Sequence, residues 1–328
     1  FVAFKTYKMN DMKGKQGMVC MGLLLVLSSC HTGKQITASG LQRKDFQTEV
    51  NGQHTDLFTL SNKQGMEVCI TNYGARVVSI LVPDRNGKRE DVVCGFSTIT
   101  EYMEQRQNFG STVGRYIGRI LNARFTLDGV EYKLVPNNGK SGHISHGGNP
   151  GFADRIWKVE QADTHRVCLS YLSPDGENGF PGNLKVTLVY SLGEDDNALD
   201  LTYEATTDAP TVLNLSHHSF FNISGNFTKS VEDQQLWVDA DRFTPYDDKK
   251  CVTGEYLPVA GTPLDFRMPH AIGECIDADH PQLKVVNGYD HTWELNTKGD
   301  DTRPAAWVYD PTSGRKMEIF TTEPGIQI

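Results

Sequence analysis

The chain has 328 residues, of which 38% are hydrophobic and 22% are charged. These proportions are those of a globular protein, and the length suffices for one large domain or two medium ones, which excludes a largely disordered chain. The net charge of -9 and the lack of any Lys/Arg cluster interleaved with aromatic residues argue against a nucleic-acid-binding protein.

The first 40 residues predict export rather than a folded domain. Residues 1–11 show no clear pattern and are assigned to an upstream extension. Residues 12–30 predict a lipoprotein signal peptide, because a basic stretch precedes an apolar run about half as long as the ~20 residues of a spanning helix. The run ends in Leu27-Ser28-Ser29-Cys30, which resembles a bacterial lipoprotein box with Cys30 as the lipidated residue. Residues 31–40 then form a tether, and we expect a periplasmic or outer-membrane lipoprotein that meets the membrane only through its lipid anchor.

The cysteines that follow this segment are too few and too scattered to form a framework. They are Cys69, Cys94, Cys168, Cys251 and Cys275. An odd number without C-x-x-C spacing argues against a set of disulfides and against a zinc knuckle. We expect most of them to be small buried side chains.

Residues 41–328 predict one all-β domain. Apolar and polar residues alternate from Leu199 to Ala205, and residues 185–192 and 235–240 also predict strands. The pairs Asn86-Gly87 and Asp128-Gly129 separate β-type runs and predict hairpin turns. No stretch of ten residues shows a helical period, so we expect a large antiparallel β-sandwich.

Polar residues of unusual type lie near these predicted strands. His217 and His218 stand side by side in a strand-like segment, so their imidazoles should point to opposite faces, and imidazole suits proton transfer near neutral pH. Arg115 and Arg119 are four residues apart, which predicts that both lie on one side of a strand. Either could bind hydroxyl groups or carboxylates, or simply pair with an acidic side chain.

A metal site is the alternative use of these residues. The candidate ligands are His143, His146, His217, His218, Asp290 and His291. No H-E-x-x-H or comparable pair is present, and the histidines are expected on strands and loops rather than on one rigid chelating face. A metal is therefore the less favoured hypothesis.

Six motifs, taken in order, resemble the aldose 1-epimerase (galactose mutarotase) family over residues 41–328. The motifs are Gly-Arg-Tyr-Ile-Gly-Arg-Ile at 114–120, Ser-His-Gly-Gly at 145–148, Glu-Asn-Gly-Phe-Pro-Gly-Asn-Leu at 177–184, Asn-Leu-Ser-His-His-Ser-Phe-Phe-Asn at 214–222, Gly-Tyr-Asp-His at 288–291 and Thr-Thr-Glu-Pro-Gly at 321–325. The resemblance implies a large antiparallel β-sandwich that interconverts the α and β anomers of a free hexose such as galactose or glucose, with no cofactor and no metal.

The resemblance also implies roles for individual residues. His218 matches the general acid, and His217 stands where an Asn is common. Arg119, His146 and Asp290 match residues that bind the sugar, although Gly118 replaces an Asn that often precedes the arginine. Phe220 stands where a Tyr is frequent and lacks its hydroxyl. Glu323 stands where a Gln or Glu contacts the substrate.

One departure from the family pattern concerns the general base. The family's base is a glutamate downstream of the Thr-Thr-x-Pro-Gly motif, and this sequence stops at Ile328 before reaching it, so we expect a domain without its C-terminal segment. Two other functions stay open, namely a lipoprotein that binds sugar without catalysis and a hexose-phosphate epimerase. The second needs a further basic residue at the site, for which Arg115 is the candidate.

Overall fold

The computed structural model describes residues 2–7 and 35–328, and regular structure in this part of the chain is mostly β. The strands are β1 (Val2–Tyr7), β2 (Glu49–Val50), β3 (Gln53–His54), β4 (Leu57–Ser61), β5 (Glu67–Thr71), β6 (Arg76–Pro83), β7 (Arg89–Asp91), β8 (Ser111–Val113), β9 (Arg119–Ile120), β10 (Arg124–Leu127), β11 (Val130–Lys133), β12 (Ile144–Ser145), β13 (Lys158–Ala162), β14 (Arg166–Ser173), β15 (Leu184–Leu192), β16 (Ala198–Thr207), β17 (Ser216–His218), β18 (Gln235–Val238), β19 (Ala240–Thr244), β20 (Leu257–Pro258), β21 (His270–Ala271), β22 (Thr292–Leu295), β23 (Ala306–Tyr309), β24 (Lys316–Thr321) and β25 (Gly325–Gln327). The helices are α1 (Ile99–Gln105), α2 (Pro281–Val286) and the 3-10 turns η1 (Arg43–Phe46), η2 (Leu121–Ala123), η3 (Gly139–Ser141), η4 (Phe152–Asp154), η5 (Glu177–Gly179) and η6 (Ile272–Glu274). Among the described helices, none has the length and apolar character needed to cross a membrane.

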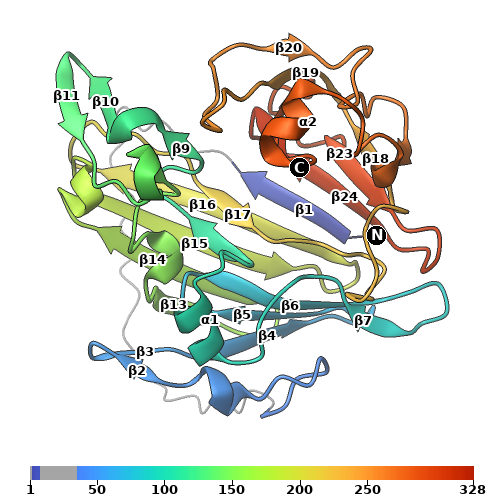
Figure 1. Cartoon of the computed structure of the whole chain (residues 1–328). Helices are drawn as coiled ribbons and strands as arrows, with labels where there is room; N and C mark the ends of the chain where they lie inside the picture. The colour runs from blue at the N-terminus through green and yellow to red at the C-terminus, as the bar shows by residue number, and fades with distance from the viewer. Residues whose placement is uncertain (1, 8–34) are drawn as a thin grey trace.

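A nine-stranded sheet runs through the middle of the molecule in the order β13-β14-β15-β16-β1-β24-β23-β18-β21 (Figure 1). A four-stranded sheet, β4-β5-β6-β7, and a second one, β20-β19-β22-β25, complete the main architecture. All neighbouring strands in these three sheets pair antiparallel except β1, which is parallel to both of its neighbours. The predicted all-β sandwich is therefore confirmed, with one parallel strand added.

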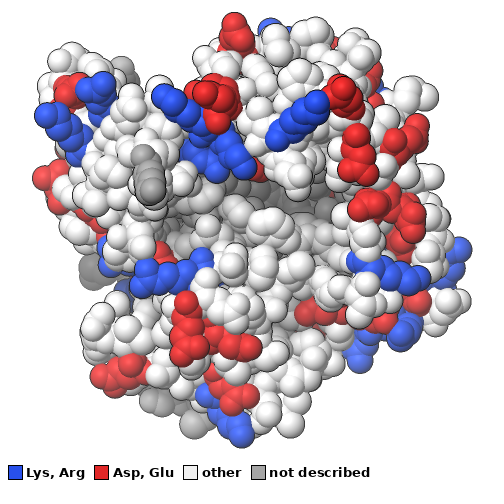
Figure 2. Space-filling model, in the orientation of Figure 1, with Lys and Arg blue, Asp and Glu red and all other residues white. Residues whose placement is uncertain are grey.

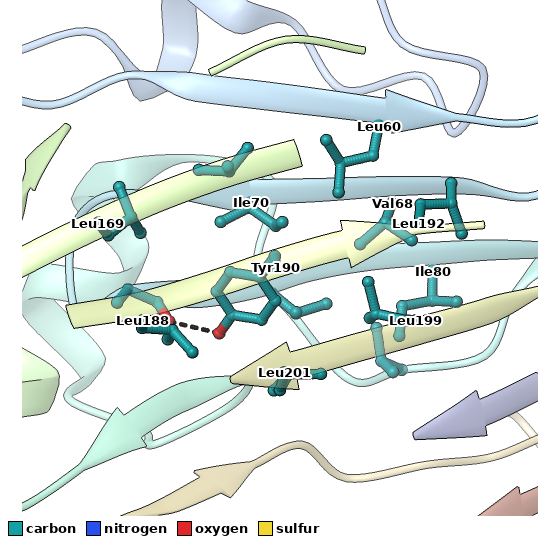
Figure 3. Close-up of a cluster of buried hydrophobic side chains, with 14 of the residues drawn as sticks. Leu60, Val68, Ile70, Ile80, Leu169, Leu188, Tyr190, Leu192, Leu199 and Leu201 are labelled. Atoms are coloured by element: carbon teal, nitrogen blue, oxygen red, sulfur yellow. Dashed lines mark hydrogen bonds between the residues drawn. The ribbon is translucent and has the colours of Figure 1, made fainter. Parts of the chain in front are cut away.

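The larger core lies between β4–β6 and β14–β16. In β15, residues Leu184, Val186, Leu188, Tyr190 and Leu192 are all buried, and they alternate with more exposed residues. Figure 3 shows such side chains meeting between the two layers. The Tyr190 hydroxyl donates a 2.7 Å hydrogen bond to the carbonyl oxygen of Ala75, so the polar end of this buried ring has a partner.

A second core lies between the β18–β23 part of the large sheet and the sheet that contains β19 and β22. Trp293 is its largest fully buried side chain, and its indole N–H donates to the Leu264 carbonyl at 3.0 Å. Val308 of β23 and Ile319 of β24 pack against both cores. The nine-stranded sheet thus joins two hydrophobic clusters.

The predicted turns and strands can be compared with the structure one by one. Both hairpins are confirmed, and Asp128 and Gly129 have φ of 50° and 79°, as a two-residue I′ turn requires. The single strand predicted over 235–240 is wrong, because β18 ends at Val238 and β19 begins at Ala240. At Asp239 between them the chain passes from the nine-stranded sheet to the sheet of β22, which ends the first ladder.

The structure differs from the expectation for residues 1–11. Val2–Tyr7 form β1, whose Ala3 pairs with Ala198 of β16 on one side and with Glu318 of β24 on the other. The facing edges of β16 and β24 would otherwise present rows of backbone N–H and C=O groups without partners, which strand insertion satisfies. Residues 12–30, with Cys30, lie outside the described residues.

Candidate active site

The predicted site residues come from short strands and loops at one face of the molecule. Figure 2 shows that this face is hollowed near its middle, between the lobe that carries α2 and the strand β17. Residues from β9, from the loop after β12, from the β17 segment and from the loop before β22 lie close to one another, as the contacts below establish. A void of about 10 Å³ beside Arg315 and an open depression beside Met268 are lined by other residues.

His146 follows β12 at a point where the backbone turns sharply. Its φ is 51°, which is unusual for a residue with a side chain, and Gly147 follows at 80°. A Cβ at Gly147 would lie 1.9 Å from the Gly114 carbonyl oxygen, so only glycine fits. Gly118 and His146 bond reciprocally, since the His146 N–H donates to the Gly118 carbonyl at 3.0 Å and the Gly118 N–H donates to His146 Nδ1 at 3.3 Å. The second bond assigns the proton to Nε2, which is left as a donor.

The paired histidines of β17 have different surroundings. The His218 ring lies 5.2 Å from the His146 ring and 5.1 Å from the Phe220 ring. The His217 ring instead lies 6.2 Å from Tyr190, a residue of the larger core, and its Nε2 is 2.7 Å from the Ser219 hydroxyl. The predicted alternation is confirmed, and His218 is the one that lies with His146.

Phe220 and Arg119 form two further walls of this group. The Phe220 ring is 48% exposed and packs edge-on against Phe109 at 5.4 Å. Arg119 lies on β9, which pairs with β12, and its Nη1 donates to the Lys250 carbonyl at 2.8 Å. An exposed aromatic face and a partly engaged guanidinium suit a ligand that has both C–H and hydroxyl groups.

Asp290 supplies the carboxylate of the group. The Asp290 carboxylate accepts a 2.6 Å hydrogen bond from the Gln327 side chain, and β25 holds Gln327 next to β22. Asp290 also raises the pKa of His218, so the two side chains are within electrostatic reach. Glu323 is exposed, and its backbone N–H donates to the Thr321 hydroxyl at 3.0 Å.

Burial controls the protonation of the histidines. Burial, followed by the neighbouring charges of His218 and Arg119, lowers the pKa of His146 to about 4. Burial, followed by His218, lowers the pKa of His217 to about 3. Burial also lowers the pKa of His218, but there Asp290 acts in the opposite direction. At neutral pH His146 is therefore a neutral donor, and His218 is the histidine best placed to gain and lose a proton.

The prediction that Arg115 and Arg119 share one side of a strand is wrong. Arg115 lies before β9, is 1% exposed and donates to Ser173 and to the carbonyls of Pro181 and Gly182. These bonds use its guanidinium to fix the loop before β15, so Arg115 is not a candidate for binding phosphate.

The histidines proposed as metal ligands do not form one cluster. His143 accepts a hydrogen bond from the Asn122 N–H, and His291 is fully buried with its Nε2 3.2 Å from the Gln282 side chain. Only His146 and His218 of the set bring their rings together in the hollow. Across residues 2–7 and 35–328, no three His, Cys, Asp or Glu side chains are grouped as metal ligands.

Sequence reasoning missed two residues near Asp290, namely Tyr246 and Gln282. They contact each other, and both contact His291, which follows Asp290. Gln282 is 36 residues from Tyr246, so no local spacing indicated that they meet. The only sequence signal was His291, which was noted for its position next to Asp290.

The fold and these contacts define a β-sandwich protein in which two histidines, an arginine and a carboxylate lie close together. The sequence model of the family described as aldose 1-epimerase matches residues 56–328. A galactose mutarotase from Sus scrofa is 38% identical over 270 residues, which cover 82% of this chain and 75% of the relative. An aldose 1-epimerase from Escherichia coli (strain K12) is 36% identical over 277 residues, 84% and 79% of the two chains.

Solved structures agree with these relatives. An aldose epimerase homologue from C. elegans has a TM-score of 0.76 at 31% identity, covering 83% of this chain and 81% of the other. A galactose 1-epimerase from Lactobacillus acidophilus NCFM has a TM-score of 0.71 at 31% identity, covering 80% and 75%. This chain belongs to the aldose 1-epimerase family, as the six motifs predicted.

Proposed function

We propose that this chain interconverts the α and β anomers of a free hexose such as galactose or glucose. The observation that carries the proposal is the grouping of His146, His218, Arg119 and Asp290 around one hollow, in a chain of the aldose 1-epimerase family. Anomer exchange begins and ends with the same sugar, so it requires proton transfers and no net oxidation.

In the proposed mechanism His218 is the general acid. Its imidazolium gives a proton to the ring oxygen while a base takes the proton of the C1 hydroxyl, so that the bond between C1 and the ring oxygen breaks and an aldehyde forms. Rotation about C1–C2 turns the other aldehyde face to the ring hydroxyl, and both transfers then run backwards. Burial makes the His218 imidazolium a stronger acid, which helps it protonate a weakly basic ether oxygen.

The other residues hold the sugar. His146 offers its Nε2–H and Arg119 its guanidinium as donors, while the Asp290 carboxylate accepts from hydroxyl groups. Phe220 presents its exposed ring to the C–H groups of the sugar. By resemblance Glu323 is a substrate contact, and the base is a glutamate that follows the Thr321-Thr322-Glu323-Pro324-Gly325 motif.

Polarimetry tests the activity directly. Freshly dissolved α-D-galactose and α-D-glucose should equilibrate faster in proportion to added protein that carries the glutamate base than in buffer alone. His218→Asn serves as the matched control because it keeps the size and polarity of the side chain. If either sugar binds but its anomer exchange is not accelerated, the protein binds sugar without catalysis. If there is neither binding nor acceleration, the proposal is refuted.

We further propose that the protein is exported and anchored by a lipid on Cys30, in the periplasm or on the outer membrane. The support is the sequence of residues 12–30 alone. Labelled fatty acid should be incorporated into the wild type and be lost in Cys30→Ala, and Cys20→Ala should retain the label because Cys20 lies within the predicted signal peptide. Absence of label on the wild type would contradict the anchor.

A further inference from the structure

The loop formed by residues 245–252 contacts both sides of the hollow. Tyr246 and Val252 form an isolated antiparallel bridge at its base, and the Cys251 N–H donates to the Asp247 carboxylate at 2.8 Å. Near its tip the Lys250 carbonyl accepts the hydrogen bond from Arg119 described above. The loop is therefore closed on itself and tied to a residue of the proposed sugar site.

The base of this loop is clamped by one side chain of α2. Gln282 Oε1 accepts from the Tyr246 N–H at 2.8 Å, and Gln282 Nε2 donates to the Tyr246 carbonyl at 3.0 Å. Gln282 Oε1 also lies 3.2 Å from His291 Nε2. A single amide thus satisfies both backbone groups of Tyr246 and links them to the residue that follows Asp290.

The Tyr246 side chain is buried while its hydroxyl has no partner in the protein. The residue is 8% exposed, and its ring lies 5.3 Å from the His291 ring. Within residues 2–7 and 35–328 the hydroxyl makes no hydrogen bond, and it is not fully enclosed either. Buried polar groups are normally paired, so a hydroxyl that opens toward solvent here is available to a ligand.

The contact of the Tyr246 ring with His291, which follows Asp290, and the bond from Arg119 to the Lys250 carbonyl place Tyr246 beside the proposed site. Burial, and after it the charge of Asp290, raises the pKa of Tyr246 to about 12, while Arg119 acts in the opposite direction. The phenol is therefore neutral at physiological pH and can both donate and accept a hydrogen bond. A sugar hydroxyl has the same two capacities.

We propose that Tyr246 is a specificity-determining substrate contact, whose hydroxyl binds one particular hydroxyl group of the hexose on the Asp290 side of the hollow. Gln282 is the positioning residue that holds Tyr246 there. This inference rests on the proposed function only in taking an aldose as the ligand.

A comparison of Tyr246→Phe with the wild type on a set of sugars tests the contact. The set contains the parent hexose and its monodeoxy analogues, each lacking one hydroxyl. Tyr246→Phe should lower kcat/KM for the parent sugar by about 3–10-fold, the range of one neutral hydrogen bond. For one analogue the two proteins should agree, because the group that Tyr246 contacts is already absent. Tyr309→Phe, whose hydroxyl is near Arg85 and not in the hollow, is the matched control.

The clamp is tested on the same sugars. Both Gln282→Ala and Tyr246→Phe should reduce the preference for the parent sugar over the same monodeoxy analogue. A general loss of stability would not select one analogue. Lys284→Ala on the exposed side of α2 should behave as the wild type. Equilibrium binding of each sugar, followed by calorimetric titration, gives the same comparison without relying on turnover.

The outcomes separate this inference from the proposed function. An unchanged Tyr246→Phe, or an equal loss on every analogue, would overturn the contact even if the wild type is an active epimerase. If Tyr246→Phe loses binding affinity for every sugar but one analogue while the wild type shows no turnover, the contact is supported and the epimerase activity is refuted. A wild type that binds none of the sugars would overturn both.

Discussion

The two sides of the hollow are held in different ways. The histidine side, which consists of His146 and His218, is fixed mainly by backbone structure. The main chain of Gly118 bonds to both the N–H and the Nδ1 of His146, and His218 lies in a strand paired with β8. The carboxylate side, which consists of Asp290 and Tyr246, is fixed by the side chains of Gln282 and Gln327. A strand or a glycine turn depends on the backbone and accepts few substitutions. A side-chain hydrogen bond, in contrast, can be removed by replacing one residue. Under the proposed function, we therefore expect single substitutions on the carboxylate side to change sugar selectivity more readily than those on the histidine side.

The largest effect is expected on the histidine side. His218→Asn should lower kcat by ~10²-fold or more while sugar binding persists, because general acid catalysis typically contributes 10²–10⁴-fold. His217→Asn should be mild in turnover, since His217 faces Tyr190 and Ser219. Steady-state polarimetry of both variants checks this, with the melting temperature as a measure of folding. Near-normal turnover in His218→Asn would refute the assignment.

The next effect comes from the carboxylate side and carries a pH signature. Asp290→Asn should lower kcat/KM by ~10–10²-fold, as expected for hydrogen bonds to a charged group. His218 must be protonated to act as an acid, so its contribution is lost as the pH rises through its pKa, which burial lowers and which a backbone hydrogen bond and the charge of Asp290 raise in part. Because Asp290 raises the His218 pKa, the variant should move the falling limb of the kcat/KM profile to lower pH. An unmoved limb would show that the two groups are uncoupled.

A smaller effect tests how the loop of His146 is supported. The Asn178 side chain donates to the Gly147 carbonyl at 2.8 Å and to the Pro150 carbonyl at 2.9 Å. Asn178→Ala should lower kcat/KM by ~3–10-fold and the free energy of unfolding by about 1–2 kcal/mol. Asn183→Ala, which removes bonds to Asp175 and Asp208 instead, should leave kcat/KM unchanged. Equal losses in kcat/KM in the two variants would mean that the Asn178 bonds have no specific part in placing His146.

The smallest effect is expected at Glu323. By resemblance a Gln or a Glu stands at this position, so Glu323→Gln should change kcat by less than ~3-fold. The comparison is informative because a general base would cost ~10²–10⁴-fold when removed. A loss of that size, measured by polarimetry at saturating sugar, would make Glu323 the base and place it opposite His218.

The all-β class and the histidine side could be predicted because their signals are local. Alternation along β15 and β16, and a two-residue turn at Asp128-Gly129, each depend on neighbours in sequence. The opposite orientations of His217 and His218 follow from the same period of two.

The carboxylate side and the insertion of β1 could not be predicted, because they depend on long-range pairing. Gln282 meets Tyr246 across 36 residues, and Ala3 meets Glu318 across almost the whole chain. The prediction for Arg115 was wrong for a related reason, because its hydrogen-bond partners Ser173 and Pro181 are far from it in the sequence. The individual roles proposed for the site residues remain predictions until the variants are measured.

The position of Val308 and Ile319 has a thermodynamic consequence. Each packs against both hydrophobic clusters, so neither cluster can melt without exposing side chains that the other also covers. We therefore expect one calorimetric transition whose van't Hoff and calorimetric enthalpies agree, rather than two separate steps. An aldose bound in the hollow at saturating concentration should then raise the melting temperature of the whole protein. Heat denaturation would therefore also detect sugars that bind without being converted.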